Sequence, residues 1–148
     1  MREESTGRLM DLLKRIDVTE VENFRKKHAL RENEGFPAFI DEKIREKKIL
    51  RKELIRQADF PEKYGYKLLS GESHTTERDY ILRFCFALGL NLRDTQRALK
   101  LYGMRELYAK DPRDIVLIVA VNKKIRSVDQ VNELLKENRQ ELLRESRR

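Results

Sequence analysis

Residues 53–71 have the sequence ELIRQADFPEKYGYKLLSG, which contains the most informative structural signals of the chain. Leu54 and Ala58 share one face of a short helix, which the segment Asp59-Phe60-Pro61 interrupts. A second short helix follows and ends at Gly71, because glycine readily takes the left-handed backbone that closes a helix. The stretch therefore predicts two helices joined by a tight turn. Such a corner can lay a helix in the major groove of DNA, or it can be an ordinary helical hairpin in a small core.

The composition favours a helical protein without a membrane partner. The 148 residues are 40% charged and 39% hydrophobic, with 6 Gly and 3 Pro, which is typical of an all-α protein. The longest apolar run, Ile115 to Val121, is far shorter than the roughly 18 residues that a membrane span needs. The N-terminal residues lack the apolar core of a signal peptide, and the one cysteine, Cys85, cannot form an internal disulfide. We therefore expect a cytoplasmic protein.

Positive charge is concentrated around the corner. The chain has a formal net charge of +7, yet residues 1–35 balance 8 basic side chains against 8 acidic ones. Residues 43–67 hold nine basic side chains and four acidic ones, a net charge of +5. Clustered positive charge is expected of a protein that binds a polyanion, although many basic faces are only solvated. Charge alone therefore leaves nucleic-acid binding as one of two interpretations.

Helical spacing and end signals predict helices along the whole chain. The first covers about 5–16, and the second is opened by a capping box at Thr19–Glu22 and closed by Gly35. The helix at 77–89 is apolar almost all round, so we expect it at the centre of the core, with Thr75 or Thr76 as its cap. Further helices are predicted at 37–48, 51–58, 61–70, 91–102 and 112–124, with a last helix that begins at Val128 and a frayed tail, RESRR, at 144–148.

The corner and its neighbours resemble a known family. KELIRQADF (52–60) is similar to the second helix of the λ-repressor-like (Cro/XRE-type) helix-turn-helix family, in which a polar pair is followed by Leu, Ala, two polar residues, a small residue, Gly and an apolar residue. PEKYGYKLLSG (61–71) resembles that family's recognition helix, and FCFALGL (84–90) is similar to its fourth helix. The chain as a whole resembles small bacterial helix-turn-helix proteins.

The resemblance implies both an architecture and a function. It implies an all-α fold with a five-helix DNA-binding domain at 36–103, an N-terminal helical extension at 1–35 and a C-terminal helical pair at 104–148. The pair either completes the core or forms a surface for a homodimer or another protein. The implied function is sequence-specific binding of double-stranded DNA through the major groove, as in a transcriptional regulator.

The resemblance also assigns roles to individual residues. A lysine can donate to guanine O6 and N7, and a glutamate can accept from cytosine N4. Arginine, lysine and serine commonly contact phosphates and set the position of the protein on the duplex. The residues that would face bases are Glu62, Lys63, Tyr64 and Lys67, and those that would contact phosphates are Arg51, Lys52 and Ser70.

Some positions depart from the family pattern in ways that weaken the resemblance. Asp59 stands where the turn usually has Gly, Leu50 replaces a Ser or Thr cap, and Pro61 removes a backbone donor. Gly65 replaces a β-branched core residue, and Tyr64 or Tyr66 is expected to fill the missing volume. These departures predict either an unusual sequence specificity or a corner that no longer binds DNA.

Other kinds of function have little support in the sequence. His28 and His74 have no partners at metal-ligand spacing, and Cys85 lies in the most apolar helix, as a core residue does. Phosphate-binding glycine loops and nucleophile motifs are absent from the sequence. We therefore expect no catalytic residue, no metal, no cofactor and no enzyme activity. The alternatives that stay open are a protein-interaction adaptor built on a degenerate corner, and an RNA or single-strand binder that stacks bases on its tyrosines.

Overall fold

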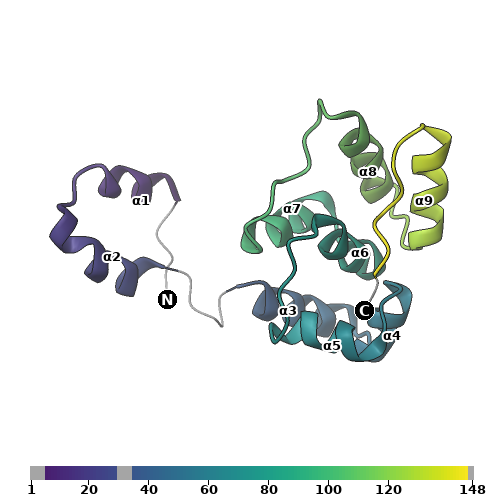
Figure 1. Cartoon of the computed structure of the whole chain (residues 1–148), viewed down its shortest axis with the longest axis horizontal. Coiled ribbons are helices and arrows are strands. Elements are labelled where there is room, and N and C mark those ends of the chain that lie inside the picture. The colour runs from purple at the N-terminus through teal and green to yellow at the C-terminus, as the bar shows by residue number, and fades with distance from the viewer. Residues whose placement is uncertain (1–5, 30–34, 147–148) are drawn as a thin grey trace. The chain divides into compact units, whose positions relative to one another are not determined.

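The computed structural model describes residues 6–29 and 35–146, which fold into helices and the turns between them (Figure 1). No strand occurs within these two ranges, so the all-α prediction is confirmed. The chain divides into two compact units, Met1–Arg31 and Glu32–Arg148. None of the helices in the described ranges is long and apolar enough to cross a membrane.

The N-terminal unit is a helical hairpin that has no core of its own. Its elements are α1 (Thr6–Leu13), the 3₁₀ turn η1 (Val18–Glu20) and α2 (Val21–His28). None of the residues in these three elements is buried. Helices this short gain little stability from propensity alone, because most helix stability in proteins comes from burying an apolar face. The large apolar side chains that the unit leaves exposed are Met10, Leu13, Val18 and Val21.

Two predictions for this unit are wrong. The turn before α2 begins at Asp17 and not at a Thr19–Glu22 capping box, since the Asp17 backbone N–H donates to the Glu20 carboxylate at 3.4 Å. α2 ends at His28, where Ala29 already has an extended backbone, and it does not run to a cap at Gly35. Residues 30–34, which the predicted helix would have included, lie outside the described residues.

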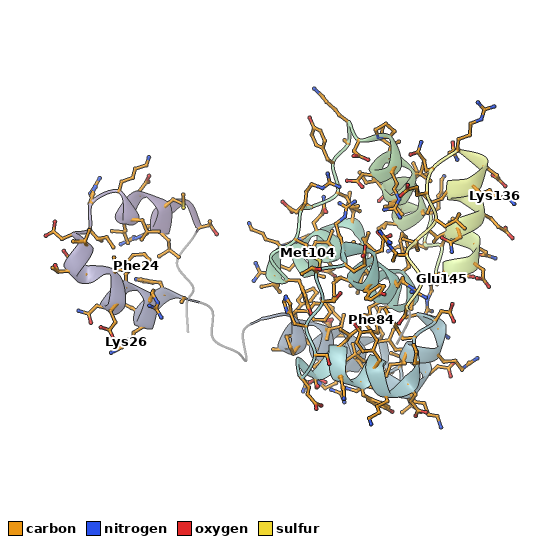
Figure 2. The ribbon with its side chains drawn as sticks, viewed as in Figure 1. Phe24, Lys26, Phe84, Met104, Lys136 and Glu145 are labelled. Atoms are coloured by element: carbon orange, nitrogen blue, oxygen red, sulfur yellow. The ribbon has the colours of Figure 1, made fainter. Side chains whose placement is uncertain are left out.

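The C-terminal unit is built around one buried helix, α6, in which every side chain from residue 81 to 88 is buried. Phe84 lies at its middle (Figure 2). Its ring stacks on that of Phe60, with the centroids 4.7 Å apart. α6 packs against α3, α4, α7 and α9, so the predicted central position is correct. The helices between residues 35 and 146 are α3 (Phe36–Lys47), α4 (Arg51–Gln57), α5 (Glu62–Ser70), α6 (Arg78–Leu88), α7 (Leu92–Leu101), α8 (Pro112–Asn122) and α9 (Val128–Glu137).

Most of the helix starts in this unit follow the end signals in the sequence. The side chains of Asn91, Asp111 and Ser127 accept backbone N–H groups in the first turns of α7, α8 and α9, as predicted. The exception is α6, whose N-cap residue is Glu77 and not Thr75 or Thr76. The Thr75 hydroxyl instead accepts the Glu77 N–H at 3.0 Å and so orders the chain just before the helix.

The C-terminal helices α8 and α9 complete the core. α8 packs against α7 and α9, and α9 packs against α6. Leu117 and Ala120 of α8 and Val131 and Leu135 of α9 are fully buried. The other side of α8 leaves an apolar strip, residues Ile115 and Val119, each 44% exposed. These helices are therefore part of one hydrophobic core with α3–α7.

Two reciprocal ion pairs join the starts of α6 and α8. Arg78 donates to both carboxylate oxygens of Asp114, at 2.5 and 3.1 Å, and Arg113 donates to both of Asp79, at 2.8 and 3.0 Å. Asp114 is fully buried. Burial alone would raise its pKa, but hydrogen bonds from Arg78 and the Tyr108 N–H outweigh burial and hold the pKa below its usual value. The Asp114 carboxylate is therefore charged in the folded protein at neutral pH.

The chain after α9 is ordered, so the prediction of a frayed tail is wrong for residues 144–146. Residues 138–146, which we call the strap, run from the end of α9 alongside α6 toward the junction of α4 and α5 (Figure 1). Leu143 is 3% exposed, and the carbonyl of Arg144 accepts a hydrogen bond from Arg83 at 2.8 Å. Side chains of the core thus bind the backbone of the strap, which a hydrophobic pattern does not reveal. Residues 147–148 lie outside the described residues.

The Asp114→Asn variant tests the reciprocal pairs. Loss of the carboxylate leaves the Arg78 charge without its partner, so we expect the free energy of unfolding at pH 7 to fall by about 3 kcal/mol. Because the folded-state pKa of Asp114 is lowered, its contribution is complete above the unfolded pKa of about 3.9 and is lost as the pH falls through the folded value. Urea denaturation from pH 7 to pH 3 should therefore show the difference from wild type shrinking in acid. The exposed Glu133→Gln variant is the control, and a difference that persists unchanged at pH 3 would contradict the assignment.

Candidate nucleic-acid interface

The corner between α4 and α5 has a left-handed residue at its centre. Asp59 has a φ angle of 64°, a conformation that Asp tolerates better than most residues other than Gly. Its N–H donates to the Arg56 carbonyl at 3.0 Å, and the Phe60 N–H donates to the Ile55 carbonyl at 3.1 Å. This pair of hydrogen bonds is a Schellman motif, which closes α4 and sends the chain into α5. Asp59 therefore supplies the left-handed residue that closes α4.

Arg83 fixes the corner from inside the core. Arg83 is 2% exposed, and its guanidinium donates to the carbonyls of Ala58 at 3.0 Å and Asp59 at 2.8 Å. It also lies over the ring of Phe60, 4.7 Å from the centroid. Burial lowers the pKa of Arg83, and the nearby Asp59 carboxylate opposes that shift. The sequence interpretation missed this residue, although an arginine inside an otherwise apolar helix was a signal that it binds something buried.

α4 and α5 approach closely because Gly65 has no side chain. A Cβ added at Gly65 would lie 2.4 Å from Cγ2 of Ile55 and 2.8 Å from its Cγ1. Ile55 on α4 thus fills the volume beside Gly65, and the expectation that Tyr64 or Tyr66 does so is wrong. The close approach sets the distance between the two helices of the corner.

The four predicted base-facing residues lie in different surroundings on α5. Glu62 and Lys63 are exposed in its first turn, and Lys67, one turn on, is half-buried. Tyr64 is also half-buried, and its ring lies 6.2 Å from Phe60 and 6.3 Å from Tyr80 between centroids. The structure therefore groups Glu62, Lys63 and Lys67 on α5 as accessible charges and places Tyr64 in an aromatic cluster beside them.

The three predicted phosphate-binding residues are all exposed, but two already have partners. Arg51 forms an ion pair with Asp41 of α3. The Ser70 hydroxyl donates to the Lys67 carbonyl at 3.2 Å and accepts the Glu72 N–H at 3.2 Å. Lys52 has no carboxylate within ion-pair distance among the described residues. A phosphate would therefore have to replace Asp41 at Arg51, whereas Lys52 could bind it directly.

The arginines and lysines of the basic region 43–67 differ in their pairing. Arg45 and Arg51 share Asp41, and Arg56 pairs with Glu53, whose pKa is lowered by the hydrogen bond from Arg56. Lys43 is largely covered and pairs with both Glu46 and Asp94. Within the part of the chain that the structure describes, five lysines of the region have no carboxylate within 4.0 Å, and these form the accessible charge: Lys47, Lys48, Lys52, Lys63 and Lys67.

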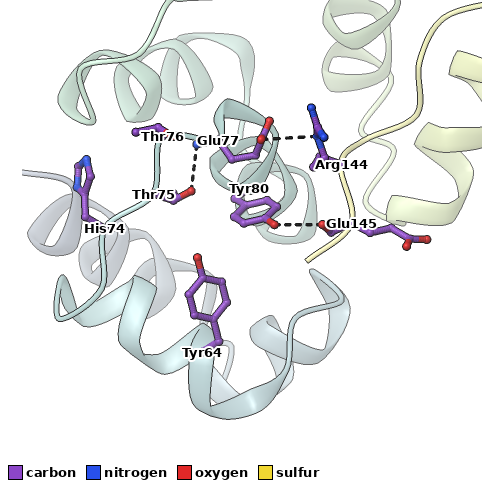
Figure 3. A pocket seen from close by; sticks show the side chains of 8 residues that line it. All are labelled: Tyr64, His74, Thr75, Thr76, Glu77, Tyr80, Arg144 and Glu145. Carbon is purple, nitrogen blue, oxygen red and sulfur yellow. Dashed lines mark hydrogen bonds and ion pairs between the residues drawn. The ribbon is translucent and has the colours of Figure 1, made fainter. Parts of the chain in front are cut away.

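An open polar cleft of about 440 Å³ lies beside the corner (Figure 3). Tyr64 of α5 points into it from one side, and Thr75 and Tyr80 line the other. The strap closes one end, where the Tyr80 hydroxyl donates to the Glu145 carbonyl at 3.0 Å and Arg144 pairs with Glu77 at 3.6 Å. Among the described residues, no three His, Cys, Asp or Glu side chains lie close enough together to hold a metal ion. The cleft connects the start of α5 to the strap.

A double-mutant cycle between Ile55 and Gly65 tests the close approach. Gly65→Val should cost about 1–3 kcal/mol by overpacking, and Ile55→Ala should cost about 2–4 kcal/mol by leaving a cavity. The double variant exchanges the large and small side chains across the interface, so it should be at least about 1 kcal/mol more stable than the sum of the single changes predicts. Denaturant midpoints measure this coupling. Ile55→Ala combined with the exposed Val119→Ala should be additive, and additive behaviour of the Ile55/Gly65 pair would contradict the packing.

Comparison with known proteins supplies no relative for this arrangement. No family model matches the chain, and no curated protein or solved structure matches it either. The function must therefore be inferred from the geometry and the charges of the corner.

Proposed function

We propose that this protein is a non-enzymatic, sequence-specific binder of double-stranded DNA of the λ-repressor-like helix-turn-helix type, acting as a transcriptional regulator. α5 would be the recognition helix in the major groove, with α4 lying across the DNA backbone. The observation that carries the proposal is the corner at Asp59, a left-handed turn fixed from within that leaves Glu62 and Lys63 exposed at the start of α5. A recognition helix presents its N-terminal side chains to base edges in this way.

The order and lengths of the helices support the proposal. α3 to α7 have 12, 7, 9, 11 and 10 residues and follow one another with short connections up to the start of α6. The shortest pair, α4 and α5, forms the corner, and the most buried helix, α6, follows it. A five-helix domain of the proposed type has this succession of elements.

The contact between Ile55 and Gly65 removes one objection to the resemblance. The family pattern has Ala at the position of Ile55 and a β-branched residue at the position of Gly65. In this chain the large and small residues are exchanged, and the Ile55 side chain occupies the place where a Gly65 side chain would lie. The departure at Gly65 is thus paired with a second departure, at Ile55 on α4. Together the two departures keep the two helices packed against each other.

The accessible charges are suited to two kinds of contact with DNA, with base edges and with phosphates. Lys63 could donate to guanine O6 and N7, and Glu62 could accept from cytosine N4, so these two residues would carry sequence recognition. Lys52 would bind a phosphate directly, and Arg51 would exchange Asp41 for a phosphate. Tyr64 in the first turn of α5 and Lys67 in the second would also contact the groove, and Ser70 would meet the DNA backbone at the end of the helix. A homodimer would place two such helices about one turn of DNA apart.

A protein-interaction adaptor is the second candidate, and one observation favours it. The N-terminal unit exposes apolar side chains on a hairpin that has no buried residue, as a segment that docks on another protein does. In that case the corner would be a scaffold, and DNA binding would be weak and independent of sequence. The two candidates differ in how they respond to DNA sequence and to salt.

Capture of fragmented genomic DNA, followed by sequencing, tests the proposal. At near-physiological salt the wild-type protein should enrich a small set of sites, and the Lys63→Glu/Lys67→Glu variant should lose that enrichment. The control is Lys123→Glu/Lys136→Glu, which makes the same change in net charge on exposed residues of the helices away from the corner. It should enrich the same sites as wild type. Weak capture without enriched sites by all three proteins would exclude major-groove recognition and favour the adaptor.

The salt dependence of binding gives an independent prediction for Lys52. Each phosphate contact that is lost should reduce the slope of log K against log salt by about 1. Lys52→Ala should therefore weaken binding by a similar factor for every DNA sequence and make the slope shallower by about that amount. Lys124→Ala, a lysine outside the corner, should leave the slope unchanged. Titrations by fluorescence anisotropy at several salt concentrations measure both, and an unchanged slope for Lys52→Ala would remove this residue from the interface.

A further inference from the structure

The strap is bound almost entirely through its main chain. Five side chains, from α6, α8 and α9, form six hydrogen bonds to strap backbone atoms at 2.8 to 3.1 Å. Arg113 donates to the carbonyls of Glu141 and Leu142, Arg83 donates to the carbonyl of Arg144, and Tyr80 donates to the carbonyl of Glu145. The side chains of Asn132 and Asp79 accept the N–H groups of Leu143 and Arg144. Together these side chains form what we call the strap groove.

Only one strap side chain is buried between residues 141 and 145. Leu143 is 3% exposed, whereas Leu142 is 50% exposed and the Arg144 side chain is 63% exposed. Main-chain hydrogen bonds give affinity without regard to sequence, and a single side-chain pocket gives selectivity. The strap groove is therefore suited to an extended backbone with one leucine, and the exposed flanking side chain of Arg144 adds an ion pair with Glu77 at 3.6 Å.

We infer that the strap groove is a peptide-binding site, and that the strap is its ligand in the same chain. The ligand is an extended segment with a leucine at the position of Leu143, which the strap supplies. The bond from Arg83 to the Arg144 carbonyl gives the site a second role, because the same guanidinium binds the corner at Ala58 and Asp59. Occupancy of the strap groove thus controls the order of the corner, and this inference does not depend on DNA binding.

Arg83 links the strap groove to the corner because a buried guanidinium needs hydrogen-bond acceptors, and both segments supply them. When the strap leaves, one of the three carbonyls that Arg83 binds is lost, and the groove side of the guanidinium opens to water. A hydrated Arg83 is no longer confined to the corner, so the Asp59 turn should open more often. We expect amide hydrogen exchange at residues 58–60 to become roughly tenfold faster or more.

The experiment must weaken the strap within the intact chain, because a tethered ligand acts at about millimolar effective concentration and excludes a peptide in solution. Leu143→Ala removes the buried side chain and should weaken strap binding on the order of 30-fold or more. Leu142→Ala, at the exposed neighbouring residue, is the matched control. Leu143→Val is a milder second variant that keeps the test valid if the alanine variant does not fold.

The probe is a fluorescent peptide with the sequence of residues 140–146, QELLRES, and its alanine analogue at the position of Leu143. The Leu143 variants should bind the leucine peptide in fluorescence anisotropy, and the wild-type and Leu142→Ala proteins should not bind it at micromolar concentration. Saturating peptide should return hydrogen exchange at residues 58–60 of the Leu143 variants to the wild-type rate, and the alanine analogue should have no effect. Failure of folded Leu143 variants to bind the peptide, or unchanged exchange at the corner, would overturn the inference.

Discussion

The hydrogen bonds of one buried cation, Arg83, hold together the three parts of the C-terminal unit that meet beside the core. A guanidinium cannot give up its proton in a protein, so its N–H groups need hydrogen-bond acceptors when it is buried in the core. Without them the folded protein would lose several kcal/mol of stability. Here the acceptors are backbone carbonyls of the corner and of the strap. Neither segment is regular secondary structure, so neither has a partner ladder that would order it. The hydrogen bonds of this cation therefore join the two segments to each other.

Arginine and lysine divide the positive charge of this chain between structure and surface. Arg78, Arg83 and Arg113 direct their planar groups inward to carboxylates and carbonyls, where several fixed donors match several fixed acceptors. The lysines of the basic region mostly have no such partners and keep their charges in solvent. A net charge of +7 therefore describes two populations with different roles. In the basic region, the five side chains that have no carboxylate within 4.0 Å among the described residues are all lysines.

The sequence predicts what depends on local signals. The caps at Asn91, Asp111 and Ser127 and the apolar character of α6 were all readable, because each is a relation between residues a few positions apart. The sequence did not predict three other features: the strap, the reciprocal pairs of α6 and α8, and the contact of Ile55 with Gly65. Each joins residues far apart in the chain or depends on the distance between two helices, and single-sequence periodicity carries no information about either. The candidate site shows the same limit. Its exposed charges were predicted, whereas Arg83 and the cover on Tyr64 follow from tertiary packing.

The position of the strap in the chain has a consequence for folding during synthesis. The strap follows all the helices of its unit in sequence, so it leaves the ribosome after them. α6 and the corner have then already left the ribosome, while Arg83 still lacks the carbonyl acceptor that the strap supplies. Domains commonly fold as units as they emerge, but this one cannot complete the surroundings of its central cation until its last described residues arrive. A nascent chain would thus carry the lysines of the basic region before it has a fixed corner on which to present them.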